Sequence, residues 1–311
     1  RNLIATGASL VFPSGTYIIS DELLFKHGQS IRCVGKVIFN GMDFVGTNGN
    51  SIVKVINEGS DYSALPTLTH DVEKETQELN FSTDHNLEIG DIICLYDDTD
   101  YSWSSSRNYY KKGEYCRVSS IISNTTVLLD SGTFDSYDAT TNTNFGAYKM
   151  NMGNFGITGN LQIIQGKTGS TYGLNILRVK DFDASNVVVY AKGSYASVCF
   201  EQCFNISFFG TGINRELSGN NTDYGLAIVN CQHVKSDGYF SAPRHGITIT
   251  SKDGVGAIVD RDIKCYGVVK TEGSGSLGAA AFNAHGNSEL YSYEGSVYGG
   301  VSIGGQLSRI N

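Results

Sequence analysis

A short phrase that returns along the chain constrains the fold more than any other feature of the sequence. Its clearest copies are Tyr172–Ile176, Tyr224–Ile228 and His245–Ile249, each an aromatic residue or His, then Gly, then alternating apolar residues. Ser197–Glu201 and Ala280–His285 show similar strand-like patterns between and after these copies. Strand repeats at intervals of about 20–30 residues are typical of a solenoid, in which each unit buries its apolar face against its neighbours. We therefore expect stacked coils with a long side wall.

The register of the repeat predicts which side chains face the core, because successive side chains of a strand point to opposite faces. Glu201, Asn283 and His285 fall at outward positions, and we expect them to share one face of the wall. The residues expected to point inward are Leu174, Ile176, Leu226, Ile228, Ile247, Ile249 and Phe282.

The composition favours an all-β chain and excludes several functions. Of 311 residues, 37 are Gly and only 3 are Pro, while charged residues make up 17%. The net charge of −8, without a basic run, argues against a nucleic-acid partner, because phosphate binding requires clustered Lys and Arg. No apolar stretch approaches about 18 residues, so we expect no membrane insertion. Seven Cys without C-x-x-C spacing predict buried free thiols, and we expect no metal or cofactor.

The chain divides into three parts by pattern. Residues 1–63 are expected to form the first coils, with short strands on either side of Gly35. Residues 64–145 are expected to form an inserted small antiparallel β-domain, in which Gly90-Asp91 joins two short strands of a hairpin. Residues 146–311 return to the solenoid and carry the candidate active face. Because the sequence starts at Arg1 and stops soon after a strand, we expect segments to be missing at both ends.

Four segments together resemble a known family. They are Phe12–Tyr17, the Tyr109–Glu114 segment of the inserted domain, Arg244-His245-Gly246, and His285-Gly286-Asn287-Ser288-Glu289. In this order they resemble the tailspikes of bacteriophages, whose fold is a right-handed parallel β-helix of the pectin-lyase type. The resemblance implies an all-β solenoid that assembles as a homotrimer on the virion tail. It also implies a bacterial surface polysaccharide, capsule or lipopolysaccharide O-antigen, as the partner that is bound and cleaved.

Hydrolysis of a glycosidic bond needs two carboxyl groups beside it, one to protonate the leaving oxygen and one to activate water or attack. Glu289, which closes a polar run after an outward strand, is the first candidate, with Asp253 in an exposed turn and His285 as a general base. The candidate substrate-binding residues are Arg244, His245, Asn283, Glu201 and Asp223, with Tyr101, Trp103 and Tyr110 as aromatic surfaces for sugar rings.

Two other functions remain open from the sequence. The Arg244, His245, His285 and Glu289 group also suits a lyase, in which a base removes the C5 proton of a uronic acid while Arg or His neutralises its carboxylate. A spike that binds its receptor without cleaving it is the third possibility. It is motivated by Asn283, which stands where many relatives carry Asp.

Overall fold

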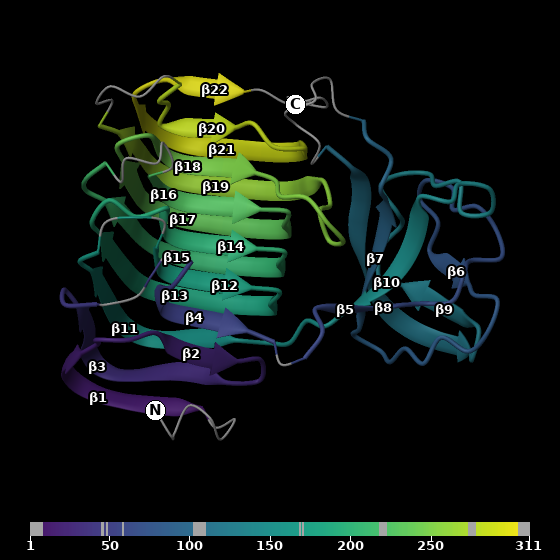
Figure 1. Cartoon of the computed structure of the whole chain (residues 1–311), viewed down its shortest axis with the longest axis horizontal. Helices are drawn as coiled ribbons and strands as arrows, with labels where there is room; N and C mark the ends of the chain where they lie inside the picture. The colour runs from purple at the N-terminus through teal and green to yellow at the C-terminus, as the bar shows by residue number, and fades with distance from the viewer. Residues whose placement is uncertain are drawn as a thin grey trace. The chain divides into compact units, whose positions relative to one another are not determined.

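The computed structural model describes residues 9–44, 47, 49–57, 59–101, 110–167, 169, 171–217, 223–272 and 278–303. Within this part of the chain the regular elements are all β-strands. The contacts divide the chain into two compact units, which Figure 1 shows with their strands labelled. The first contains residues 1–58, 153–250 and 260–311, and the second contains residues 59–152 and 251–259. Among the described residues, no helix has the length and apolar character needed to cross a membrane.

The first unit is a parallel β-helix built from two sheets that run its full length. Among the described residues every strand pairing within each of the two sheets is parallel, and consecutive strands of the β-helix alternate between the sheets. Sheet A has the strand order β1 (Leu10–Ile18), β3 (Ser30–Gly41), β11 (Gly156–Gln165), β13 (Lys180–Ala191), β15 (Phe204–Asn214), β17 (Gln232–Ala242), β19 (Asp260–Thr271) and β21 (Ser288–Tyr298). Sheet B has the order β2 (Leu23–Lys26), β4 (Ser51–Ile56), β12 (Tyr172–Leu177), β14 (Ala196–Glu201), β16 (Tyr224–Val229), β18 (His245–Thr250), β20 (Phe282–Ala284) and β22 (Val301–Ile303).

The core of the β-helix lies between these sheets and is stacked coil upon coil. All seven residues predicted to point inward belong to its central apolar cluster, which confirms the register of the repeat. On sheet B the core position of one strand pairs with the core position of the next, as in the row Leu174, Val198, Leu226, Ile247 and Phe282. The seven cysteines are all free and buried, as the sequence predicts.

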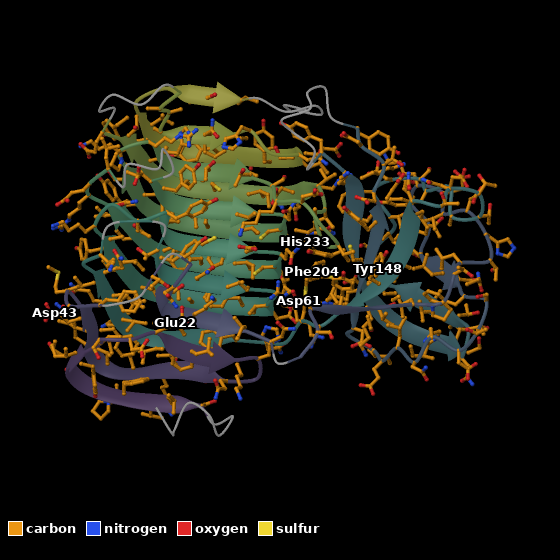
Figure 2. The ribbon with its side chains drawn as sticks, viewed as in Figure 1. Glu22, Asp43, Asp61, Tyr148, Phe204 and His233 are labelled. Carbon is orange, nitrogen blue, oxygen red and sulfur yellow. The ribbon has the colours of Figure 1, made fainter. Side chains whose placement is uncertain are left out.

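The corner between sheet B and sheet A is set by one residue with positive φ in successive coils. Asn205, His233 and Asp262 occupy this position with φ of 58°, 58° and 52°. Asn, Asp and His are the side chains that tolerate this region best. Phe204 and His233 lie next to each other at this corner, with ring centroids 5.1 Å apart (Figure 2).

Sheet A bends along its length at a column of glycines. A Cβ on Gly238 would lie 1.7 Å from the carbonyl oxygen of Gly210, and one on Gly267 would lie 2.1 Å from that of Gly238. Only Gly allows strands to approach this closely at positive φ.

The sequence-based expectation of two separate strands on either side of Gly35 is wrong, because the single strand β3 continues through this residue at φ of 84°.

The second unit is an antiparallel sheet, sheet C, with its own apolar cluster. Its strand order is β5 (Tyr62–Ala64), β10 (Phe145–Met150), β7 (Ile92–Asp97), β8 (Lys112–Ser123), β9 (Thr126–Leu129) and β6 (Glu78–Asn80). The expected hairpin at Gly90-Asp91 is not formed, because no strand precedes the turn among the residues described there. Instead the N–H of Glu88 donates to the Asp91 carboxylate at 2.8 Å, and Leu87 packs into the cluster.

Candidate functional site

A row of aromatic and imidazole rings follows the outer face of sheet B, near the start of its strands. We call this row, formed by Tyr172, Tyr195, Tyr224, His245 and His285, the ring ladder. Neighbouring ring centroids lie 5.2, 5.2, 5.5 and 6.2 Å apart in that order. The first three spacings follow from the fold, because adjacent strands stand about 4.8 Å apart and the repeat places an aromatic residue or His at nearly the same point of these coils. His285 is the exception, since it follows the end of β20.

His245 is the most unusual member of the ladder because it is buried with one ring nitrogen unpartnered. Its ring lies parallel to that of Tyr224, at an angle of 9°. The side chain is 1% exposed, and its Nε2 has no hydrogen-bond partner among the described residues. Buried polar atoms are nearly always paired, so this unpaired nitrogen makes His245 a candidate for ligand contact.

The other nitrogen fixes the tautomer of His245. Nδ1 lies 2.9 Å from the carbonyl oxygen of Ala280. The N–H of Ala280 has two possible acceptors, the carbonyl oxygen of Arg244 at 3.0 Å and Nδ1 of His245 at 3.2 Å, and the carbonyl oxygen is the nearer. We therefore assign the proton to Nδ1, which donates to Ala280 and leaves Nε2 as a hydrogen-bond acceptor.

Burial keeps this imidazole neutral. Loss of solvation is the main reason that the pKa of His245 is lowered from 6.5 to about 4; the Ala280 carbonyl raises it by a smaller amount, and the positive charge of Arg244 lowers it by less still. At neutral pH the side chain accordingly accepts a hydrogen bond. It is poorly matched to general-base catalysis, which works best when the pKa lies near the operating pH.

Arg244 supplies the cation of the site. Its Nη1 donates to the Tyr224 hydroxyl at 3.2 Å, and its guanidinium carbon lies 5.8 Å from the centre of that ring. Its Nε is buried and has no partner among the described residues. A donor on Arg244 and an acceptor on His245, adjacent in sequence and both orphaned, form a matched pair for a hydroxyl-bearing or acidic sugar.

The structure brings other predicted residues to the same sheet but gives them internal contacts. Asn283, predicted at an outward position, is only 4% exposed, and its Oδ1 accepts a hydrogen bond from Thr248 at 3.3 Å. Asp223 precedes Tyr224 and is fully buried, with φ of 55°. His285 is half-buried beside His245. Glu201 ends β14, three strands from β20, or about 14 Å along the wall, so it serves a different part of any bound polymer.

Glu289 has a structural contact that the sequence does not indicate. It begins β21 in sheet A, where its carboxylate lies 3.2 Å from Nε of Arg261. The Arg261 side chain is 0% exposed and that of Glu289 is 19% exposed. Removing one partner of a buried ion pair leaves an uncompensated charge, so this contact holds the turn after His285 in place.

Three of the remaining predicted residues, Asp253, Tyr101 and Tyr110, belong to the second unit. Asp253 belongs to the second unit and accepts a hydrogen bond from the N–H of Gly254 at 2.9 Å, as a turn residue does. Tyr110 is 1% exposed, so the expectation that it presents an open ring is wrong. Tyr101 is 42% exposed, and its hydroxyl donates to Asp97 at 2.8 Å. Trp103 lies outside the described residues.

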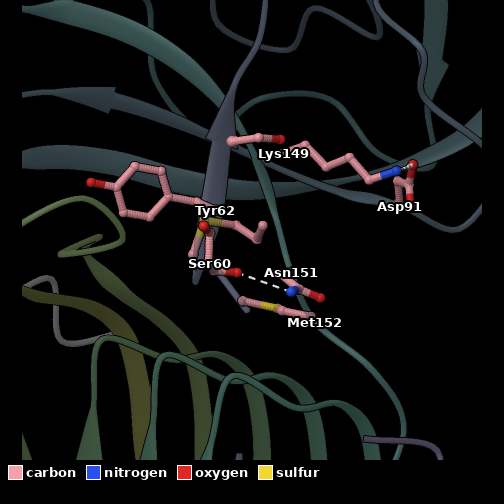
Figure 3. A pocket seen from close by; sticks show the side chains of 8 residues that line it. Ser60, Tyr62, Asp91, Lys149, Asn151 and Met152 are labelled. Atoms are coloured by element: carbon pink, nitrogen blue, oxygen red, sulfur yellow. Dashed lines mark hydrogen bonds and ion pairs between the residues drawn. The ribbon is translucent and has the colours of Figure 1, made fainter. Parts of the chain in front are cut away.

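The second unit has a hollow of about 420 Å³, which Figure 3 shows from close by. Its polar side chains are largely occupied with each other. Lys149 forms an ion pair of 2.6 Å with Asp91, and the amide of Asn151 donates to the Ser60 carbonyl at 2.9 Å. Sheet B therefore remains the better candidate for ligand binding.

Sequence reasoning missed Tyr172, Tyr195 and Tyr224 as functional residues. The aromatic position of the repeat suggests packing, and these rings do pack, in a cluster with Cys199 and Ala227 that is separate from the core. The signal that identifies them is their position at the N-terminal edge of consecutive parallel strands, which stacks them on the outside.

Two family profiles match this chain. The profile described as Gp49, pectin lyase-like, matches residues 191–311. The profile described as the Ig-like domain of tailspike-like proteins matches residues 57–150. A search of curated proteins gave no significant match.

Three solved structures with the same fold are phage tailspikes. The tailspike gp49 from Pseudomonas phage LKA1 is 26% identical, with a TM-score of 0.77 over 97% of this chain and 49% of that one. The tailspike gp61 of Pseudomonas phage phi297 is 20% identical, with a TM-score of 0.77 over 94% of this chain and 49% of that one. The Gp54 tailspike of Acinetobacter baumannii bacteriophage AP22, solved in complex with A. baumannii capsular saccharide, is 22% identical, with a TM-score of 0.73 over 94% and 46%. This chain thus spans about half the length of these tailspikes.

The parallel sheets, the inserted antiparallel unit and the two profiles define a pectin-lyase-like β-helix that carries a tailspike Ig-like domain. In both parts the chain is similar to bacteriophage tailspikes, and this similarity supports a location on the phage tail.

Proposed function

We propose that this chain binds a bacterial surface polysaccharide along the ring ladder of sheet B and cleaves it there. The observation that carries the proposal is the pair of buried, unpartnered atoms on adjacent residues, Nε of Arg244 and Nε2 of His245. A sugar that supplies an acceptor to the first and a hydroxyl donor to the second satisfies both atoms. Tyr195 and His285, the two half-buried members of the ladder, offer further contact area to a polymer that runs across the coils, whereas Tyr172 and Tyr224 are buried.

The charges favour an acidic sugar. Arg244 is the cation at the ladder, and a guanidinium holds a carboxylate by two parallel hydrogen bonds. The AP22 tailspike, which shares the fold, was solved with a capsular saccharide, and this supports a bacterial polysaccharide as the ligand class.

The contacts favour β-elimination over the hydrolysis expected from the sequence. Hydrolysis needs two carboxyl groups at the bond, but Glu289 is held by Arg261 and Asp253 forms a turn in the other unit. In elimination, Arg244 pairs with the uronate carboxylate and His285 takes the C5 proton. The electrons of the C5–H bond form the C4–C5 double bond, the C4–O bond breaks with its electron pair on oxygen, and that oxygen takes a proton from water.

The test uses the purified chain and the polysaccharide of the host strain. Elimination predicts new absorbance near 235 nm from the unsaturated sugar, together with shortened chains, and Arg244→Ala is expected to abolish both. New reducing ends without that absorbance would show hydrolysis. Tight binding without cleavage would show a receptor-binding spike, and neither binding nor cleavage would refute the proposal.

The homotrimer implied by the resemblance stays a prediction. Light scattering measures it directly, with three times the monomer mass of 33.6 kDa as the expected result.

A further inference from the structure

A second hollow, of about 360 Å³, lies on the outer face of sheet A where β3, β11 and β13 bend. It is built by irregular pairing. The register shifts between Thr158 and Asn160, where β3 has two residues more than β11, and again between Ser185 and Val187, where β13 has one residue more than β15. Asn186 occupies that position in β13 with φ of 59°. Bulges of this kind redirect side chains, and here they place a polar column on the surface.

The column consists of Lys36, Asn160 and Asn186, one from each of three adjacent strands. Lys36 and Asn160 are direct partners across the sheet, and adjacent strands stand about 4.8 Å apart. Gln162 and Tyr190 belong to the lining beside the column. This arrangement presents amides and an aromatic ring to one space.

In the hollow of the second unit the polar side chains are bound to each other, as Lys149 is to Asp91. The hollow on sheet A differs in this respect. Among the described residues, the Lys36 ammonium makes no ion pair, and the side-chain amides of Asn160, Gln162 and Asn186 make no hydrogen bond. Four such groups lining one hollow present both donors and acceptors to a ligand.

The charge of the hollow is opposite to that of the whole chain. The chain has a net charge of −8, yet the lining contains Lys36 and no carboxylate. The guanidinium of Arg215 adds a second cation, with its carbon 4.7 Å from the ring centre of Tyr190. Cations with amides and an aromatic ring suit an acidic, hydroxyl-rich ligand.

We infer that this hollow is a second, non-catalytic binding site for an acidic oligosaccharide. It is distinct from the ring ladder, because it lies on sheet A whereas the ladder lies on sheet B. The identity of its ligand as a segment of the same polymer rests on the proposed function. A second site would keep the cleaved polymer attached and raise the effective concentration of uncut chain at the ladder.

The variant that tests this site is Lys36→Gln combined with Asn186→Gly. Glycine accepts the positive φ of position 186, so the exchange removes the amide without straining the bend. Asn205→Gly is the matched control, since Asn205 has nearly the same φ of 58° at a different corner of sheet A. All variants are made in the full chain with Arg244→Ala, which weakens binding at the ladder.

The probe is a pool of oligosaccharides released from the host polysaccharide by mild acid and separated by charge. The acidic pool is expected to bind the Arg244→Ala chain in calorimetry, and the hollow variant is expected to weaken it about tenfold, as loss of one charge-assisted contact predicts. The Asn205→Gly control should bind unchanged, and the neutral pool should bind far more weakly.

Unchanged binding in the hollow variant would overturn the inference while leaving cleavage at the ladder intact. Absence of binding in the Arg244→Ala chain would also overturn it. A change in oligomeric mass by light scattering would instead identify the hollow as a contact between copies of the chain. Failure of the wild-type chain both to bind and to cleave the intact polymer would refute the proposed function as well.

Discussion

Mild acid is expected to destabilise the β-helix through one buried imidazole, that of His245. Its pKa is lowered from 6.5 to about 4 in the folded chain, chiefly by burial. Between these values the unfolded chain binds a proton that the folded chain does not, so this stabilising contribution is complete above pH 6.5 and is lost as the pH falls toward 4. The linkage relation gives a loss of about 2 kcal/mol between pH 7 and pH 5 from this residue alone.

The assay is urea unfolding at both pH values for the wild type and for His245→Gln. The difference between the two proteins removes the contribution of other titrating groups, and the variant is expected to lose about 2 kcal/mol less on acidification. His70→Gln is the control, because His70 is exposed and should leave the pH dependence unchanged. Equal pH dependence in wild type and His245→Gln, or an NMR titration of the His245 ring near 6.5, would refute the reasoning.

Three further predictions concern the fold. Gly267→Ala should lower the free energy of unfolding by at least about 3 kcal/mol, because its Cβ would lie 2.1 Å from the Gly238 oxygen. Gly254 has open space around it, so Gly254→Ala should lower this free energy by only about 1 kcal/mol. Equal losses in chemical denaturation would contradict the steric argument. Glu289→Gln should destabilise the chain by about 3 kcal/mol, because it removes the carboxylate charge beside the buried Arg261, yet the folded variant should still cleave polymer; loss of cleavage at unchanged stability would return Glu289 to the active site. All seven thiols should be inert to Ellman's reagent in the native chain and should react after unfolding, because all are buried. Burial raises the pKa of the Cys265 thiol, for example, to about 12. A thiol that reacts in the native chain would show that the core opens.

The repeat predicts the β-helix because strand alternation is a local property. A residue such as Leu226 is fixed inward by the pattern of its own strand, and stacking then aligns it with Ile247 in the next coil. The bend of sheet A is less visible in the sequence. Gly35 looks like a break between strands, and only the pairing of whole strands shows that the chain continues through it.

The candidate site is only partly predictable because its contacts join distant segments. The Arg-His dipeptide at 244 and 245 is conspicuous, but the burial of His245 depends on Tyr224 and Ala280 in other coils. Glu289 shows the opposite case. Its polar sequence context suggests an active site, and Arg261 from the preceding coil gives it a structural role instead. Outward alternation likewise does not ensure exposure, as Asn283 shows by pairing with a neighbouring strand.

The most direct measurement of the central claim is a crystal structure of the chain with oligosaccharides from the host polymer, with the proton-accepting residue replaced by His285→Ala. The account predicts sugar density along the ring ladder, with oxygen atoms within hydrogen-bond distance of Nε of Arg244 and Nε2 of His245. Density that occupies another surface and leaves both of these atoms without a sugar contact would contradict it.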